Sequence, residues 1–311
     1  MRVLLALGGN AMASPEGRVG PEDQIAAARI AMDSVADLVA RDVDVVITHG
    51  NGPQVGNLLV KNEIAASVVP PVPLDWCGAQ TQATLGFVLM NALDEALRRR
   101  RVGRRSVTVV TRTLVYLDDP GFTRPTKPIG RFLSAEEAAV LQEHGETWED
   151  RGAKGWRRVV ASPEPREILD AEAVRTLVGA GFVVLANGGG GVPVVREPAG
   201  LRGVEAVIDK DLGAALLALT VEANVLVIVT DVTNAVLRFG TPDAEPLGRV
   251  DVRRMRALAR EGHFASGSMG PKVEATCRFV EQGGTRAGIT NLENIVDAVE
   301  GKVGTVVVPA G

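Results

Sequence analysis

The chain is poor in cysteine and in aromatic residues. Its 311 residues include two cysteines, and Phe, Trp and Tyr together make up 4%. Cys77 and Cys277 are too few and too far apart for a disulfide framework, so we predict a reducing compartment. The scarcity of aromatic side chains excludes a base-stacking surface for nucleic acid.

Charge of one sign is not in excess either. The chain has 34 Lys and Arg against 38 Asp and Glu, which gives a formal net charge of −4. Proteins that hold nucleic acid through its phosphates normally carry a basic excess. We therefore expect no nucleic-acid partner.

Long hydrophobic runs are also lacking. The longest apolar stretch, about residues 212–229, is interrupted by Glu222 and Asn224, so we predict no transmembrane helix and no membrane partner. A strand-like run begins at Arg2, which leaves no room for a signal peptide. We therefore expect a soluble, cytoplasmic protein. Hydrophobic residues nevertheless make up 46% of the chain, enough for a sizeable core.

Short apolar, β-branched runs alternate with helical patterns along the whole chain. The expected strands are 2–7, 43–48, 106–115, 182–186, 225–229, 286–290 and 305–308, and the expected helices are 21–41, 53–65, 78–101, 212–222, 250–261 and 271–282. The strands are apolar throughout, which is typical of strands covered by helices on both faces. We predict a three-layer α/β fold around a mostly parallel sheet, in a single domain over residues 1–311.

Residues 117–166 depart from this alternation. The segment is rich in charged residues and contains five of the 17 prolines and two of the three tryptophans. A loop of this length is seldom structureless. We expect a small protruding subdomain or lid.

Three glycine-rich turns follow predicted strands, at residues 8–9, 50–52 and 188–191. Ligands of parallel sheets bind at the carboxyl ends of the strands, and glycines let backbone N–H groups approach an anion. Ordinary turns, or a flexible linker at 188–191, remain alternatives. The second turn precedes a helix with Pro53 near its start, which favours an anion pocket, and its glycine spacing does not match a dinucleotide fingerprint. His49 is either a base or a hydrogen-bonded structural residue.

Lysine is rare, at six of the 34 basic positions. A compact ammonium on a flexible stem suits a moving phosphoryl group, although chance retention is the alternative. Lys210 lies between two aspartates at a helix start, where a charge-balanced surface would also explain it. Lys272 lies in a first helical turn, where the helix dipole disfavours a cation and a bound anion would explain its presence. Lys127 lies in the 117–166 excursion and could swing over such a site.

Several catalytic signatures are absent from the sequence. It contains no Walker A motif, no zinc-type Cys/His spacing, no G-x-S-x-G elbow and no protein-kinase signature. We predict no metal ligands in the chain. Three glycine turns combined with lysines at helix starts indicate a site for several phosphates, and therefore phosphoryl transfer.

The sequence resembles the carbamate kinases of the amino acid kinase family over essentially its whole length. The resemblance is carried by residues 6–11, 49–57, 73–75, 125–130, 155–158, 162–163, 188–193, 203–211, 262–272 and 304–308. Two positions depart from the family pattern. Residues 230–235 contain Asp231 but lack the further acid or the aromatic residue that relatives often carry there, and Ala161 replaces a proline.

The resemblance implies a homodimer. An N-terminal part, about residues 1–187, would bind carbamate or carbamoyl phosphate and dimerise, and a C-terminal part, about 188–311, would bind ADP or ATP with Mg²⁺ carried by the nucleotide phosphates. The implied catalytic residues are Lys127, Lys210, Asp211 and Lys272. The implied carbamate and phosphoryl side is Gly8, Gly9, Asn10, Thr48, Gly50, Asn51, Gly52, Gly188 and Gly189. The implied nucleotide side is Lys210, Thr230, Asp231, Met269, Gly270 and Lys272.

The implied reaction is carbamoyl phosphate + ADP → carbamate + ATP, in arginine or agmatine catabolism. Neither reacting oxygen carries a proton at neutral pH, so the reaction needs no general base, and the motifs offer three lysines and no obvious base. Two alternatives stay open: a kinase of another small acid, and a non-catalytic sensor of nucleotide or carbamoyl phosphate.

Overall fold

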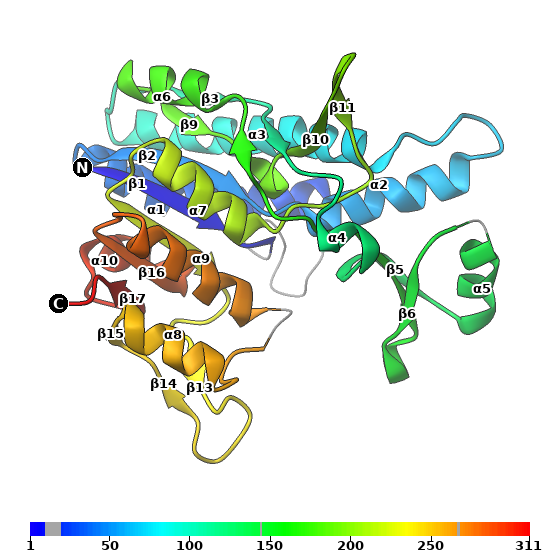
Figure 1. Cartoon of the computed structure of the whole chain (residues 1–311). Helices are drawn as coiled ribbons and strands as arrows, with labels where there is room; N and C mark the ends of the chain where they lie inside the picture. Colours follow the sequence, from blue (N-terminus) through cyan, green and yellow to red (C-terminus); the bar gives the residue numbers. More distant parts are fainter. Residues whose placement is uncertain (10–19, 144, 266–267) are drawn as a thin grey trace.

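A large central sheet organises the chain (Figure 1). The computed structural model describes residues 1–9, 20–143, 145–265 and 268–311, so Asn10 lies outside the described residues. The eight strands, in spatial order, are β15 (Arg249–Asp251), β17 (Thr305–Val308), β16 (Arg286–Asn291), β12 (Val225–Thr230), β1 (Arg2–Leu7), β2 (Asp44–His49), β9 (Val183–Leu185) and β3 (Ser106–Thr108). Neighbouring strands are parallel except β16 and β17.

Helices cover both faces of this sheet. One face carries α1 (Pro21–Ala40), α3 (Leu74–Arg99) and α10 (Ile295–Glu300), and the other carries α6 (Ala171–Gly179), α7 (Lys210–Thr220), α8 (Val252–Arg260) and α9 (Met269–Glu281). Strand β1 shows why its sequence does not alternate. Leu4 and Ala6 are buried in one core cluster, and Val3, Leu5 and Leu7 are buried in the other. The predicted three-layer α/β class is confirmed.

The run 106–115 is not one strand, as the sequence analysis expected. Its first residues form β3, and Arg112–Leu114 form β4 in a second, four-stranded sheet with β8 (Glu167–Ile168), β10 (Val192–Glu197) and β11 (Gly200–Gly203). The break lies at Thr111, whose N–H and hydroxyl both donate to Oε1 of Gln82, at 2.9 and 3.2 Å. A buried glutamine on α3 thus takes the place of a strand partner. Helices α6 and α10 were not predicted.

Residues 127–160, called the arm below, form a small unit of their own. It consists of β5 (Lys127–Leu133), β6 (Trp148–Asp150) and β7 (Trp156–Val160) in an antiparallel sheet, with α5 (Ala135–Glu143). Figure 1 shows α5 and β6 standing away from the large sheet. The arm has its own core around Trp148, and its base packs Ile129 against Val55 and Leu59 of α2 (Gly52–Ala65).

The remaining elements are short. They are α4 (Pro120–Thr123), the hairpin of β13 (Val236–Leu237) and β14 (Glu245–Pro246), and single 3-10 turns at Gly152–Lys154, Gly188–Gly190 and Leu292–Asn294. Within the described ranges, no helix combines the length and the apolar character needed to cross a membrane. Cys77 and Cys277 are both buried and free.

Candidate active site

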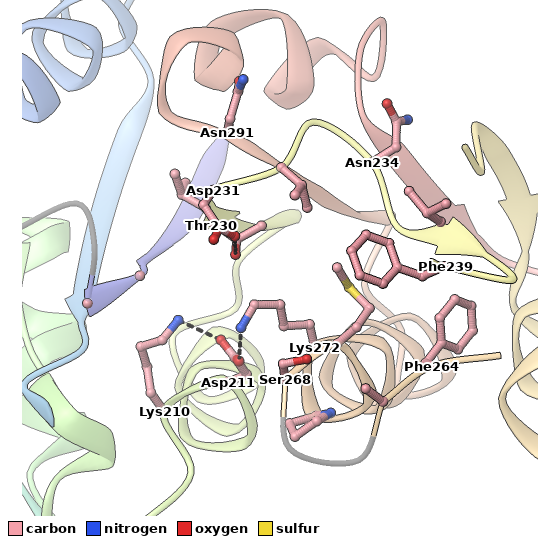
Figure 2. Close-up of a pocket in the computed structure, with 18 of the residues that line it drawn as sticks. Lys210, Asp211, Thr230, Asp231, Asn234, Phe239, Phe264, Ser268, Lys272 and Asn291 are labelled. Carbon is pink, nitrogen blue, oxygen red and sulfur yellow. Dashed lines mark hydrogen bonds and ion pairs between the residues drawn. The ribbon is translucent and has the colours of Figure 1, made fainter. Parts of the chain in front are cut away.

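A cavity of about 760 Å³ opens at the carboxyl ends of β1 and β12 (Figure 2). This is the edge of a parallel sheet at which ligands bind. Strand ends contribute Gly8, Gly9, Thr230 and Asn291, and α9 contributes Met269 and Lys272. The arm contributes Lys127, and the start of α7 contributes Lys210 and Asp211.

Two helix starts bring two lysines to one carboxylate. Lys210 Nζ donates to Oδ1 of Asp211 at 2.6 Å, and Lys272 Nζ donates to Oδ2 at 2.9 Å (Figure 2). The side chain of Asp211 is 5% exposed, and those of Lys210 and Lys272 are 14% and 16% exposed. Residues 61 positions apart in sequence therefore share one shielded ion cluster.

The close approach of these charges shifts the pKa of both Asp211 and Lys210. Burial alone would raise the pKa of Asp211, but the ammonium groups of Lys210 and Lys272 outweigh it and lower the pKa to about 2. Burial and the charge of Lys272 lower the pKa of Lys210, and Asp211 opposes that shift. Two cations facing one carboxylate leave a positive surplus, which favours an anion at this end of the cavity.

The third lysine reaches the cavity from the arm. Lys127 Nζ donates to Oδ2 of Asp209 at 2.7 Å. The other oxygen of Asp209 accepts the backbone N–H groups of Asp211 and Leu212, at 2.9 and 3.4 Å, and so caps α7. Sequence reasoning missed Asp209 as the partner of Lys127, although an aspartate just before a helix is a recognisable cap signal.

The second glycine turn supports the cavity without lining it. A Cβ atom on Gly50 would lie 3.0 Å from the backbone N of Gly9 and 3.5 Å from Cδ of Lys210. Asn51 donates to Oγ1 of Thr81 at 2.9 Å, and Gly52 is the first residue of α2. Gly50 therefore lets its own turn, the first glycine turn and Lys210 at the start of α7 approach one another closely.

The glycine run 188–191 is buried and is not a flexible linker. A Cβ atom on Gly188 would lie 2.5 Å from the ring of His49, and one on Gly189 would lie 2.2 Å from Nδ2 of Asn51. Thr48 donates to the carbonyl oxygen of Asn187 at 2.8 Å, just before the run. Gly188 and Gly189 thus pack against the end of β2 and the turn that follows it, and they do not line the cavity.

His49 has the environment of a structural histidine. It is 2% exposed and does not line the cavity, and its Nδ1 donates to the carbonyl oxygen of Gly50 at 3.1 Å. Burial, helped by the charge of Lys210, lowers the pKa of His49 to about 4. The ring is therefore neutral near pH 7, which favours the structural alternative over a base.

The end of the cavity away from Lys210 is apolar. Phe239, which is 78% exposed, and Phe264 lie there (Figure 2), and Met269 also lines the cavity. Neither phenylalanine was identified from the sequence, because only the hairpin of β13 and β14 and the approach to α9 bring them to the cavity. Thr230 donates to Asp231 at 3.1 Å, and both residues line the cavity. Gly270 is not among the lining residues, and its N–H donates to the carbonyl oxygen of Ala265 at 2.8 Å.

The described residues include no group of three or more His, Cys, Asp or Glu side chains arranged to hold a metal ion. Both oxygens of Asp211 face ammonium groups, which leaves this carboxylate engaged.

Known proteins that resemble this chain include kinases. A family model described as the amino acid kinase family matches residues 1–291. The chain belongs to the amino acid kinase family. It is therefore a kinase, as the sequence analysis predicted.

Within this family, the chain is similar to carbamate kinases. The chain is 45% identical over 311 residues to the carbamate kinase of Pyrococcus furiosus, covering 99% of each. It is also 45% identical over 309 residues to the carbamate kinase-like protein YahI of Escherichia coli, covering 97% of each. Among solved structures, carbamate kinase from Giardia lamblia bound to AMP-PNP is similar with a TM-score of 0.94 and 40% identity, over 99% of this chain and 98% of that one. The resemblance to carbamate kinases is confirmed.

Proposed function

We propose that this kinase transfers a phosphoryl group reversibly between carbamoyl phosphate and ADP, giving carbamate and ATP. The observation that carries the proposal is the approach of Lys127, Lys210 and Lys272 to one cavity with an apolar far end. Carbamate would then decompose to ammonia and CO₂, in arginine or agmatine catabolism.

The nucleotide would lie along the cavity from its apolar end to the lysines. The structure of the Giardia carbamate kinase holds AMP-PNP, which supports a nucleotide here. We infer that Phe239, Phe264 and Met269 contact the base and that Thr230 and Asp231 lie beside the ribose. The phosphates would face Lys210 and Lys272, with Mg²⁺ bound to them and neutralising part of their charge.

The carbamoyl side would lie at the first two glycine turns. Gly8 and Gly9 line the cavity, and Gly50 lies directly behind Gly9 and Lys210. Backbone N–H groups at such turns suit the oxygens of a carboxyl-type acceptor. Asn10 continues the first turn in sequence and is assigned to the same side.

The reaction would proceed by positioning and electrostatic stabilisation. Charge spread over the transferring phosphoryl oxygens is stabilised by preorganised ammonium groups, and no proton needs to be removed from the attacking oxygen. Ionised Asp211 would hold Lys210 and Lys272 at the spacing that the transfer requires. The buried, neutral His49 is not needed as a base.

The deciding experiment mixes the purified protein with MgADP and carbamoyl phosphate and follows ATP by a luciferase assay. We expect ATP formation, which the Lys210→Ala variant should lose. An absence of ATP would contradict the proposed reaction.

A kinase of another small acid is the second candidate, because a relative that is equally similar is described only as carbamate kinase-like. ADP release from MgATP with an acetylated amino acid, and no ATP formation from carbamoyl phosphate, would favour it. Nucleotide binding without any turnover would favour a sensor.

We also propose a homodimer. Large apolar side chains are exposed on α2, on α3 and between them, and such patches on a folded domain mark interaction surfaces. They are Ile64, Val68, Val69, Trp76 and Phe87.

A further inference from the structure

We propose that the ion pair between Glu164 and Arg278 is a positioning contact. It fixes the base of the arm, which carries Lys127, relative to α9, which carries Lys272. The inference rests on the proposed phosphoryl transfer, in which these two lysines act on the same group from two sides.

The pair is a directed, two-point contact. Nη1 of Arg278 donates to Oε1 of Glu164, and Nη2 donates to Oε2 at 3.4 Å. Nε of Arg278 donates to Glu274, one turn earlier on α9, at 2.6 Å. The side chains of Glu164 and Arg278 are 29% and 33% exposed. A planar guanidinium held at three nitrogens defines an orientation, which a single ammonium contact would not.

Glu164 lies on the segment by which the chain leaves the arm, four residues after β7 ends at Val160. This segment and the one that enters the arm lie together at its base. Asp119, on the entering segment, accepts the N–H of Gly121 at 2.7 Å and the N–H of Glu164 at 3.1 Å. A Cβ atom on Gly121 would lie 2.8 Å from the carbonyl oxygen of Ser162. The entering and leaving segments are thus fastened to each other at the residue that binds Arg278.

The same segment determines where Lys127 lies. Lys127 is registered opposite Val160 in the β5–β7 pair, and the next residue, Ala161, forms a parallel bridge to Ala206. Glu164 follows three residues later. A displacement of Glu164 would therefore be passed to the strand against which Lys127 is registered.

At the other end of the contact, α9 is held as a rigid body. Val273, Cys277 and Phe279 are at most 1% exposed and pack in the core between α9 and the sheet. Arg278 lies six residues after Lys272, about 9 Å along the helix axis. The ion pair therefore connects the arm to the same rigid element that presents Lys272.

The first test compares Glu164→Gln with Glu167→Gln in the full chain. Glu167, three residues further on, pairs with Arg196 at 3.2 Å in an exposed contact between β8 and β10, so it is the matched control. We expect Glu164→Gln to lower kcat for ATP formation about tenfold with KM for ADP within about twofold, because a small displacement of a catalytic group slows the chemical step. The melting temperature should change little, since part-exposed ion pairs contribute little to stability.

Arg278→Met should give the same loss of kcat. The Glu164→Gln/Arg278→Met double variant should lose no more than either single variant, because both residues act through one contact. Additive losses, or wild-type kcat in Glu164→Gln, would overturn the proposal.

A second readout needs no substrate. Nitroxide labels on Ala139→Cys in α5 and Ala259→Cys in α8 report the distance from the arm to the body, and both native thiols are buried. Glu164→Gln should broaden this distance distribution and Glu167→Gln should not, and an unchanged distribution in Glu164→Gln refutes the contact as a positioning device. If the wild-type protein forms no ATP, the proposed function fails, and this measurement by itself decides whether the pair positions the arm.

Discussion

Asp211 is the residue on which the charge arrangement of the cavity depends. One carboxylate holds two ammonium groups at 2.6 and 2.9 Å, and the lysines in turn keep it ionised. Each lysine is thereby held at the cavity. Replacing either of them tests the proposed chemistry directly.

We predict that Lys210→Ala and Lys272→Ala each lower turnover by about 100-fold or more, the scale of losing one preorganised electrostatic group. Steady-state ATP formation measures the effect. Lys61→Ala, on an exposed position of α2, is the control and should keep wild-type turnover. Near-normal turnover in either cavity variant would contradict the assigned role.

His49 predicts a pH dependence of stability. Its pKa is about 4 in the folded protein against 6.5 for an ordinary histidine, so the unfolded chain binds the proton first as the pH falls. The free energy of unfolding should therefore decrease between about pH 6.5 and pH 4, by up to about 3 kcal/mol from this residue. Urea unfolding at a series of pH values measures the decrease.

The matched variant for this measurement is His49→Gln, which keeps a donor for the carbonyl oxygen of Gly50 and does not titrate. Its free energy of unfolding should depend less on pH over the same interval. Identical slopes in the two proteins would show that His49 does not contribute.

At the scale of elements, the ends of four strands position the turns around the cavity. These strands are β1, β2, β9 and β12. Parallel strands end at one edge of the sheet, so turns that are far apart in sequence meet there. The starts of α7 and α9 add the lysines, and the buried run 188–191 allows the β2 turn to pack behind them. A side chain added at Gly188 or Gly189 would therefore clash with the end of β2 or with the turn that follows it.

We predict that Gly189→Ala destabilises the fold by about 2–5 kcal/mol. Its φ is +65°, and the new Cβ would lie 2.2 Å from the Asn51 amide, so backbone strain adds to overpacking. Gly179→Ala, at the end of α6 with nothing within 4 Å, is the control and should be neutral or slightly stabilising. Thermal unfolding of the two variants measures both effects, and equal melting temperatures would contradict the packing argument.

At the scale of the whole molecule, a three-layer body carries the arm (Figure 1). The arm brings Lys127 to the cavity, where it pairs with Asp209. The exposed apolar side chains on α2 and α3 lie outside both core layers. They are the surface on which we expect a second copy to dock.

We predict a mass of about twice 32.7 kDa in solution by light scattering. Trp76→Glu combined with Phe87→Glu should shift the protein toward the monomer, because charges introduced in an apolar interface lose solvation. Leu201→Glu, an exposed apolar position on β11, is the control and should leave the mass unchanged. A wild-type monomer would contradict the proposed dimer.

The amino-acid sequence by itself determined the layered α/β class, most strands and helices of the large sheet, and the lysines that line the cavity. These follow from local patterns, because apolar runs, turn glycines and helix starts express backbone preference and burial over a few residues. The tertiary structure alone decided that 106–115 divides between two sheets at Gln82, that Lys127 pairs with Asp209, and that the run 188–191 packs against protein. Such contacts join residues up to 139 positions apart, so they depend on how the layers and the arm pack together and not on any local pattern.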